Sequence, residues 1–192
     1  LYMLVFHVMA GDPEDNMQEV WGCINQLYRD HKVVTQYCNL KIASFHEPGQ
    51  FPKLKGKGAE VKDLVAPLAH VWNEKTTGSN DRRHRWISRM LLHQLIAQRI
   101  LHDYKDQTFL PVQAALDFAE AIGAIHHMWS FVANGSDKKG LHIWNIPTKL
   151  HYLHHLGEKA MFLNPRKGNT MVEETYMGVC KTLAQSCLHS TN

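Results

Sequence analysis

Three histidines in the last third of the chain have a spacing that could hold a metal ion. His151, His154 and His155 stand at positions i, i+3 and i+4 of a helix that we predict to begin at Ile146-Pro147. Two imidazoles on one flank of a helix can bind the same ion. A third ligand is not evident, because none of the four cysteines lies near in sequence, and a metal site needs enough ligands as well as the right spacing. We therefore favour ordinary hydrogen bonds at the edge of the core for these histidines.

Two adjacent glutamates follow a basic loop further along the chain. The loop from Asn164 to Asn169 contains proline and glycine, which interrupt helices, and it carries Arg166 and Lys167. The four residues from Thr170 to Glu173 match a capping box, in which the threonine hydroxyl and the glutamate carboxylate satisfy free amides at a helix start. Glu174 lies off the apolar stripe of that predicted helix, where a negative charge contributes about 0.3–1 kcal/mol. Both carboxylates therefore have a structural explanation.

Another basic loop precedes a predicted helix in the first third of the chain. The segment from Pro48 to Gly58 has the composition of a linker, and its end carries Lys53, Lys55 and Lys57 among glycines. Such a loop at a helix N-terminus can hold a phosphate on free amides and ammonium groups. Its sequence does not match the phosphate-loop pattern G-x-x-x-x-G-K-[ST], so nucleotide hydrolysis is not indicated. Phosphate binding and a solvated linker stand as equal alternatives.

Arginines crowd the first turns of a helix that we predict to be capped by Ser79-Asn80-Asp81. Cations at a helix N-terminus oppose the macrodipole, at a cost of roughly a few tenths of a kcal/mol for each charge. We expect an anionic group to compensate them, either acidic side chains from another segment or the backbone of a nucleic acid. Of the sequence patterns in the chain, this one most favours DNA contact. The arginines concerned are Arg82, Arg83, Arg85 and Arg89.

Three segments follow one another in an order found in a known protein family. They are FPKLKGKGAEVKDLVAPLAHVW at 51–72, PTKLHYLHHL at 147–156 and NPRKGNTMVEETYMGVCK at 164–181. Together they resemble the C-terminal region of transposase-like proteins derived from CACTA-type DNA transposons, including multi-copy transposon-derived proteins of some algal genomes. The resemblance covers most of residues 40–182.

The resemblance implies a ribonuclease-H-like transposase, whose centre holds divalent ions such as Mg²⁺ on two aspartates and one glutamate. It further implies that the helix opened by Thr170 presents that glutamate, with Glu174 or Glu173 as the metal ligand. The two aspartates would have to precede Leu1, since no strand–Asp–strand arrangement is visible in the chain. Leu1 is not an initiator methionine, so we expect a piece of a longer polypeptide. The isolated piece should not cleave DNA, and its status as an enzyme is left open.

Length and composition favour one ordinary globular domain. The chain has 192 residues and a formal net charge of +3, which is compatible with nucleic acid but does not require it. Its cysteines show no metal-finger or disulfide spacing, and its apolar first ten residues are too short to span a bilayer. We expect a protein inside the cell, in the nucleus if it contacts DNA, with DNA or other proteins as partners.

Hydrophobic periodicity predicts a mainly α-helical fold over residues 1–192, with about six helices in one bundle and at most a short strand near 40–45. Asp12-Pro13 should start the first long helix, and Pro67 should kink a later one. The first ten residues read as a buried strand or the tail of a core helix. Gly123, with Ala115 and Ala119, suggests a close crossing of two helices.

Two functions are consistent with these patterns. The first is a transposase-derived helical region that grips DNA and contributes the last metal-binding glutamate of the nuclease site. The second is a non-catalytic helical interaction or scaffold subunit packed against larger protein partners, which a large exposed apolar patch would support. A histidine-rich metal protein is a third, less favoured alternative.

Overall fold

Helices make up the fold, as the periodicity predicts. The computed structural model describes residues 1–137 and 143–167, and no strand occurs in these two ranges. A π-helical turn, η1 (Leu4–Val8), and a 3-10 turn, η2 (Ile42–Ser44), accompany five α-helices. The α-helices are α1 (Pro13–Asp30), α2 (Gly58–Thr76), α3 (Arg82–Asp103), α4 (Val112–Asp137) and α5 (Thr148–Lys159).

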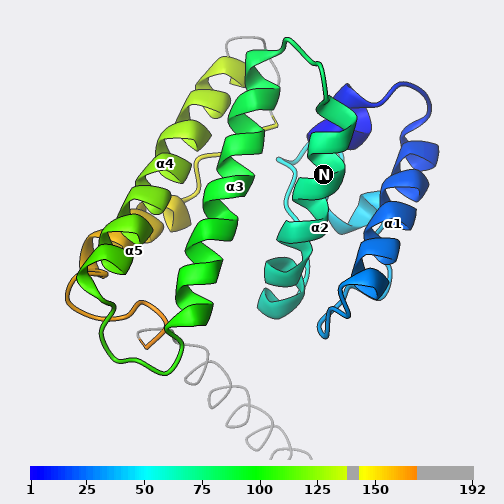
Figure 1. Ribbon diagram of the computed structural model, residues 1–192. Coiled ribbons are helices and arrows are strands. Elements are labelled where there is room, and N and C mark those ends of the chain that lie inside the picture. The colour runs from blue at the N-terminus through cyan, green and yellow to red at the C-terminus, as the bar shows by residue number, and fades with distance from the viewer. Residues whose placement is uncertain (138–142, 168–192) are drawn as a thin grey trace, which may run out of the picture.

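The long helices lie side by side in chain order (Figure 1). Short connections make α3 antiparallel to both α2 and α4, because a chain that leaves one helix has only a few residues in which to turn back. Helix α5 packs on α4, α1 packs on α2, and η1 contacts both α1 and α2. The first turns of α3 therefore lie at the same end of the molecule as the last turns of α2 and α4.

One continuous hydrophobic core runs through the described helices. At the α1–α2 side it is built on Tyr28 and Trp72, which are fully or almost fully buried. The Trp72 indole N–H donates to Ser88 Oγ at 3.1 Å, which joins α2 to α3. At the other side, Phe118 and Ile122 of α4 are buried between α3 and α5.

The start of α1 confirms the predicted capping. Asp12 is the N-cap, its carboxylate accepts a hydrogen bond from Glu14 N at 2.8 Å, and Pro13 is the first helical residue. Upstream, the alternative of a buried strand is wrong, because residues 4–8 form η1. The buried Asn16 side chain donates to the Val5 carbonyl at 2.9 Å and so fixes η1 to α1.

The strand allowed near 40–45 is replaced by η2. Buried Leu40 and Phe45 stand five residues apart, so they do not follow the two-residue alternation of a strand. Pro67 lies inside α2, which continues through it from Gly58 to Thr76.

The close crossing of two helices involves a different glycine from the one predicted. A Cβ atom at Gly123 would meet nothing within 4 Å. A Cβ atom at Gly157 of α5 would lie 3.1 Å from Ile122 Cγ2 and 3.6 Å from Ala119 Cα of α4. Ala119 is thus at the crossing as expected, and Gly157 supplies the space.

Candidate nucleic-acid interface

The basic residues singled out in the sequence lie at different places in the fold. The arginines occupy the first turns of α3, at one end of the molecule. Lys53, Lys55 and Lys57 precede α2, whose 19 residues span about 28 Å and separate them from the arginines. Arg166 and Lys167 lie beside the connection between α3 and α4, at the far end of the 22-residue α3. The fold therefore does not bring the arginines together with either of the other two groups.

Arg83 is engaged in capping α3. The Asp81 carboxylate accepts a hydrogen bond from Arg83 N at 2.7 Å, as a helix N-cap does. It also accepts from the Arg83 guanidinium, at 3.1 Å from Nε and 2.7 Å from Nη2. These bonds from Arg83 lower the pKa of Asp81 to about 2. An acidic side chain is expected to compensate the arginines at this helix end, and Asp81 does so for Arg83. The role of Arg83 in nucleic-acid contact stays a prediction.

The other three arginines surround an aromatic surface. Arg82, Arg85, Trp86 and Arg89 stand on one face of α3 and line a hollow of about 320 Å³. The Arg82 guanidinium lies 4.9 Å from the centre of the Phe131 ring of α4 and 5.7 Å from that of Trp86. Arg89 lies 5.8 Å from the Trp86 ring centre. We call these five residues the arginine–aromatic patch.

No carboxylate neutralises this patch within the part of the chain that the structure describes. Arg82, Arg85 and Arg89 are all exposed, and no ion pair joins them to an acidic side chain of residues 1–137 or 143–167. Arg82 and Arg89 make cation–π contacts with these rings, which hold a guanidinium in place and leave its charge uncompensated. The patch is therefore a preorganised, positively charged surface.

The lysine loop before α2 is tied down mainly by its own neighbours. Lys55 pairs with Glu47, and its carbonyl accepts a hydrogen bond from the Tyr37 hydroxyl at 3.0 Å. Lys57 is the N-cap residue of α2, and its backbone N–H donates to Glu60 at 2.8 Å. Because Glu60 occupies the helix start where a phosphate would bind, the linker alternative is favoured here. Lys53 and Lys57 keep exposed side chains.

Arg166 and Lys167 follow an asparagine that anchors the chain after α5. Asn164 is fully buried, and its side-chain amide donates to the carbonyls of Tyr104 at 2.8 Å and Gln107 at 2.9 Å. Both basic side chains are exposed. The asparagine thereby fixes the point from which they project, and sequence reasoning missed this role because its partners lie about sixty residues away.

The proposed metal-binding glutamates fall outside the described residues. Glu173 and Glu174 belong to the range 168–192, so their assignment as Mg²⁺ ligands and as catalytic residues stays a prediction. Within residues 1–137 and 143–167, no three His, Cys, Asp or Glu side chains are grouped so that they could hold a metal ion.

The histidines of α5 form a chain of contacts that the spacing only partly indicated. His155 Nε2 lies 3.0 Å from His151 Nε2, and His155 Nδ1 lies 2.8 Å from Glu158 Oε2. The bond to His155 holds the pKa of Glu158 below its usual value. On the other flank, the His154 ring lies 5.4 Å from the ring of His126 of α4. The contact with His126 could not be read from the spacing within one helix.

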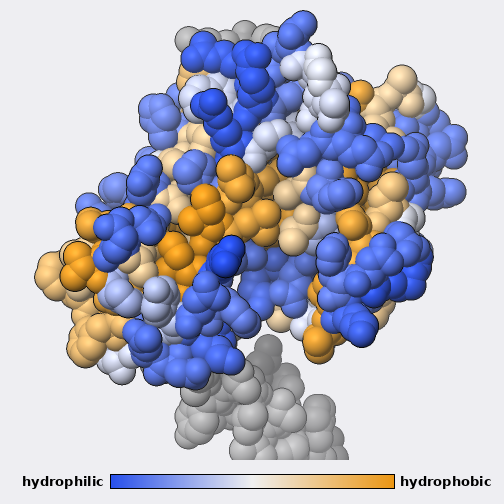
Figure 2. Space-filling view, in the orientation of Figure 1, coloured by the Kyte–Doolittle hydropathy of each residue, from blue (hydrophilic) through white to orange (hydrophobic). Residues whose placement is uncertain are grey.

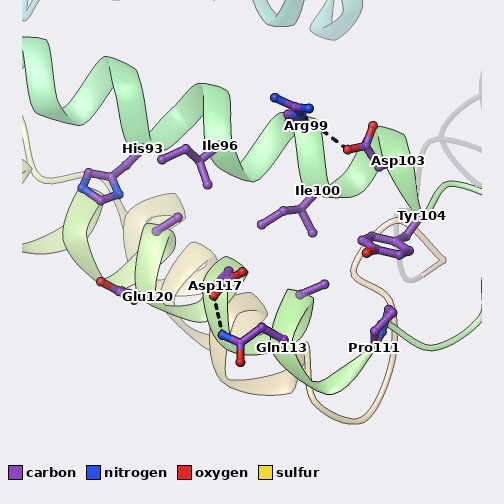
Figure 3. Close-up of a pocket in the computed structure, with 12 residues that line it drawn as sticks. His93, Ile96, Arg99, Ile100, Asp103, Tyr104, Pro111, Gln113, Asp117 and Glu120 are labelled. Atoms are coloured by element: carbon purple, nitrogen blue, oxygen red, sulfur yellow. Dashed lines mark hydrogen bonds and ion pairs between the residues drawn. The ribbon is translucent and has the colours of Figure 1, made fainter.

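A groove between α3 and α4 is the second hollow of note (Figure 3). It has a volume of about 470 Å³, and its apolar lining includes Ile96, Ile100 and Ala114. Polar side chains stand along its sides, and Arg99 and Asp103 pair with each other there at 3.5 Å. Figure 2 shows hydrophobic residues gathered where α3 and α4 meet. Exposed apolar residues of these helices include Leu92, Ile96, Val112 and Leu116.

Comparisons of the chain with protein-family models, with curated proteins and with solved structures give no match. The likeness to transposase-derived proteins therefore depends on the three sequence segments alone. No helix in the described ranges has both the length and the apolar character needed to cross a bilayer.

Proposed function

We propose that this chain is a helical module that binds nucleic acid, DNA in particular, through the arginine–aromatic patch. The observation that carries the proposal is a set of three exposed arginines on one face of α3 without a carboxylate partner in the described structure. Two of them, Arg82 and Arg89, are held against aromatic rings. Guanidinium groups bind phosphate oxygens in a forked geometry, and they supply most of the sequence-independent affinity for DNA. This role is the DNA-gripping part of the transposase-derived function, and it would place the protein in the nucleus.

Catalysis is a separate part of that function. Strand cleavage with Mg²⁺ would require Glu174 or Glu173 together with two aspartates from chain that precedes Leu1. None of these groups is within the described residues, so the proposal assigns no catalytic step to this domain.

The patch can be tested by measuring the salt dependence of DNA binding. Arg82, Arg85 and Arg89 are changed together to glutamine, and binding of a labelled duplex is followed by fluorescence anisotropy at several salt concentrations. Because each lost phosphate contact removes about 0.9 from the slope of log K against log salt, we expect the slope to fall by about 2–3 and the affinity to drop at least tenfold.

A matched control removes the same charge elsewhere. Lys32, Lys62 and Lys105 are exposed on other parts of the molecule, and changing all three to glutamine should alter the slope by less than about 1. Equal effects of the two triple variants would mean that binding follows net charge alone, and the patch would then lose its assignment. Arg83 is left unchanged in both, because its loss would disturb the cap of α3.

A protein-interaction module is the second candidate, and the groove between α3 and α4 favours it. Ile96 lines the groove and is 36% exposed, and Leu92 and Leu116 of the same two helices are 54% and 48% exposed, so apolar surface is open to solvent in and beside the groove. The groove also presents Asp117 and Glu120, neither of which has a basic partner among the described residues. An apolar floor beside carboxylates that lack a basic partner in the described structure fits an amphipathic helix from a partner protein that carries basic residues beside its apolar stripe.

A further inference from the structure

A pair of histidines on α5 faces nitrogen to nitrogen. His151 and His155 stand at i and i+4, and their Nε2 atoms are 3.0 Å apart with the ring planes inclined by 76°. Two ring nitrogens at this distance require a shared proton or a shared cation, because two lone pairs alone would repel each other. In the metal-free protein they share a proton, with one ring donating an N–H to the other.

Glu158 decides which nitrogen of His155 carries the lone pair. Its carboxylate lies 2.8 Å from His155 Nδ1, so a neutral His155 donates from Nδ1 and leaves Nε2 as an acceptor toward His151. A carboxylate that holds the distal ring nitrogen in this way is the usual companion of a metal-binding histidine. The arrangement therefore prepares His155 Nε2 to bind a cation without a change of tautomer.

The separation of the two nitrogens is that of a hydrogen bond in the metal-free protein, and it is also compatible with one class of cation. With metal–nitrogen bonds of about 2.1 Å, two ligands lie about 3.0 Å apart at a right angle and about 3.4 Å apart at the tetrahedral angle. Right-angle coordination is typical of Ni²⁺ and Cu²⁺, which also bind imidazole strongly. The His155 side chain is 45% exposed, so an ion and its remaining water ligands can reach the pair.

We propose that His151 and His155 form a two-nitrogen binding site for a divalent nickel or copper ion, with Glu158 as the residue that orients His155. The site has two protein ligands, and water fills the other positions. It is distinct from the Mg²⁺ site implied for Glu174, which would use oxygen ligands, and it does not depend on the arginine–aromatic patch.

The site can be tested by calorimetric titration of the whole chain with NiCl₂ near pH 7.5. We expect one site tighter than the background of other histidines. Changing His151 and His155 together to alanine should remove that site and lower the affinity at least about tenfold, since both nitrogen ligands are lost. The control is a variant with His102 and His127, exposed histidines of α3 and α4, changed to alanine. It should keep the site.

A second variant separates ligand loss from a change in folding. Glu158→Ala leaves both ligands in place and should weaken Ni²⁺ binding by about tenfold, the lower end of the range for partners of metal-bound histidines. Circular dichroism should show unchanged helix content in all three variants. The proposal fails if the His151/His155 variant binds Ni²⁺ as the unmodified chain does, or if the His102/His127 control loses as much affinity.

Discussion

At the scale of single residues, one carboxylate at the start of α3 binds a single arginine out of a group of four. Asp81 caps the helix and accepts hydrogen bonds from Nε and Nη2 of the Arg83 guanidinium. Its neighbours Arg82 and Arg85 lie on other faces of the same helical turn and cannot reach this carboxylate with the same geometry. The sequence shows four arginines between positions 82 and 89 without distinguishing them, and in the structure one of them belongs to the helix cap while the other three are exposed.

This pairing leads to a prediction about acid stability. The pKa of Asp81 is lowered from 3.8 to about 2, so its charged form favours the folded state. Its contribution is fully present above about pH 4 and is lost as the pH falls toward 2. Asp81→Asn keeps a good N-cap but removes the ion pair, and should lower the free energy of unfolding by about 1 kcal/mol at pH 7.

Urea unfolding at pH 7, 4 and 2 measures this effect. The difference between Asp81→Asn and the unmodified chain should shrink as the pH falls and should be small at pH 2, where about half of the Asp81 carboxyls are protonated in the folded state. Asp12→Asn is the matched control, since Asp12 caps α1 without an arginine on its carboxylate. A difference at pH 2 as large as that at pH 7 would mean that capping, and not the charge, explains the stabilisation.

At the scale of elements, the crossing of α4 and α5 depends on the absence of one side chain. Gly157 faces Ile122 and the backbone at Ala119, and there is no room for a methyl group without movement of Ile122. Gly123 is also inside a helix, but the space around its α-carbon is open. We therefore expect substitution by alanine to change the stability of the protein in opposite directions at the two glycines.

Gly157→Ala should destabilise the protein by about 1 kcal/mol, because overpacking against Ile122 outweighs the gain in helix propensity. Gly123→Ala should stabilise it by about 0.5–1 kcal/mol, because only the gain in propensity applies. Chemical denaturation of both variants measures the two changes. If the two variants shift in the same direction, the close approach of α5 to α4 at Gly157 is wrong.

At the scale of the whole molecule, the antiparallel helices place the two candidate surfaces at different positions along the same pair of elements. The arginine–aromatic patch joins the start of α3 to the last turns of α4. The apolar groove joins the second half of α3 to the first half of α4. Contact with nucleic acid at one end and with a protein at the other are thus compatible within one domain.

The groove can be examined with two designed helical peptides. Both carry one leucine stripe, flanked by lysines in the first peptide and by glutamates in the second. We expect the lysine peptide to bind at least about tenfold more tightly, because it alone matches Asp117 and Glu120. Ile96→Ser, at an exposed apolar residue of the groove lining, should reduce this binding, and the triple arginine variant should not. Fluorescence anisotropy of the labelled peptides measures both affinities. Equal binding of the two peptides would exclude a basic amphipathic helix as the partner of the groove.

The sequence by itself determined the helical class, the main helix starts and the residues that carry charge. These features depend on local physics, since Asp12-Pro13 or Asp81 satisfies free amides within its own first turn. The helical spacing of apolar residues likewise determines which face of each helix is buried, irrespective of the element that packs against that face. The same local reasoning left a strand open near residue 42, where the described parts of the chain contain no other strand to pair with it.

Tertiary structure alone decided which of these residues meet. Phe131 joins the arginines of α3 from 45 positions beyond Trp86, Gly157 takes the role expected of Gly123, and Asn164 ties the chain after α5 to the turn between α3 and α4. Each of these contacts depends on how far one helix slides and rotates against another. That register is set by packing of the whole core, which no window of local sequence contains.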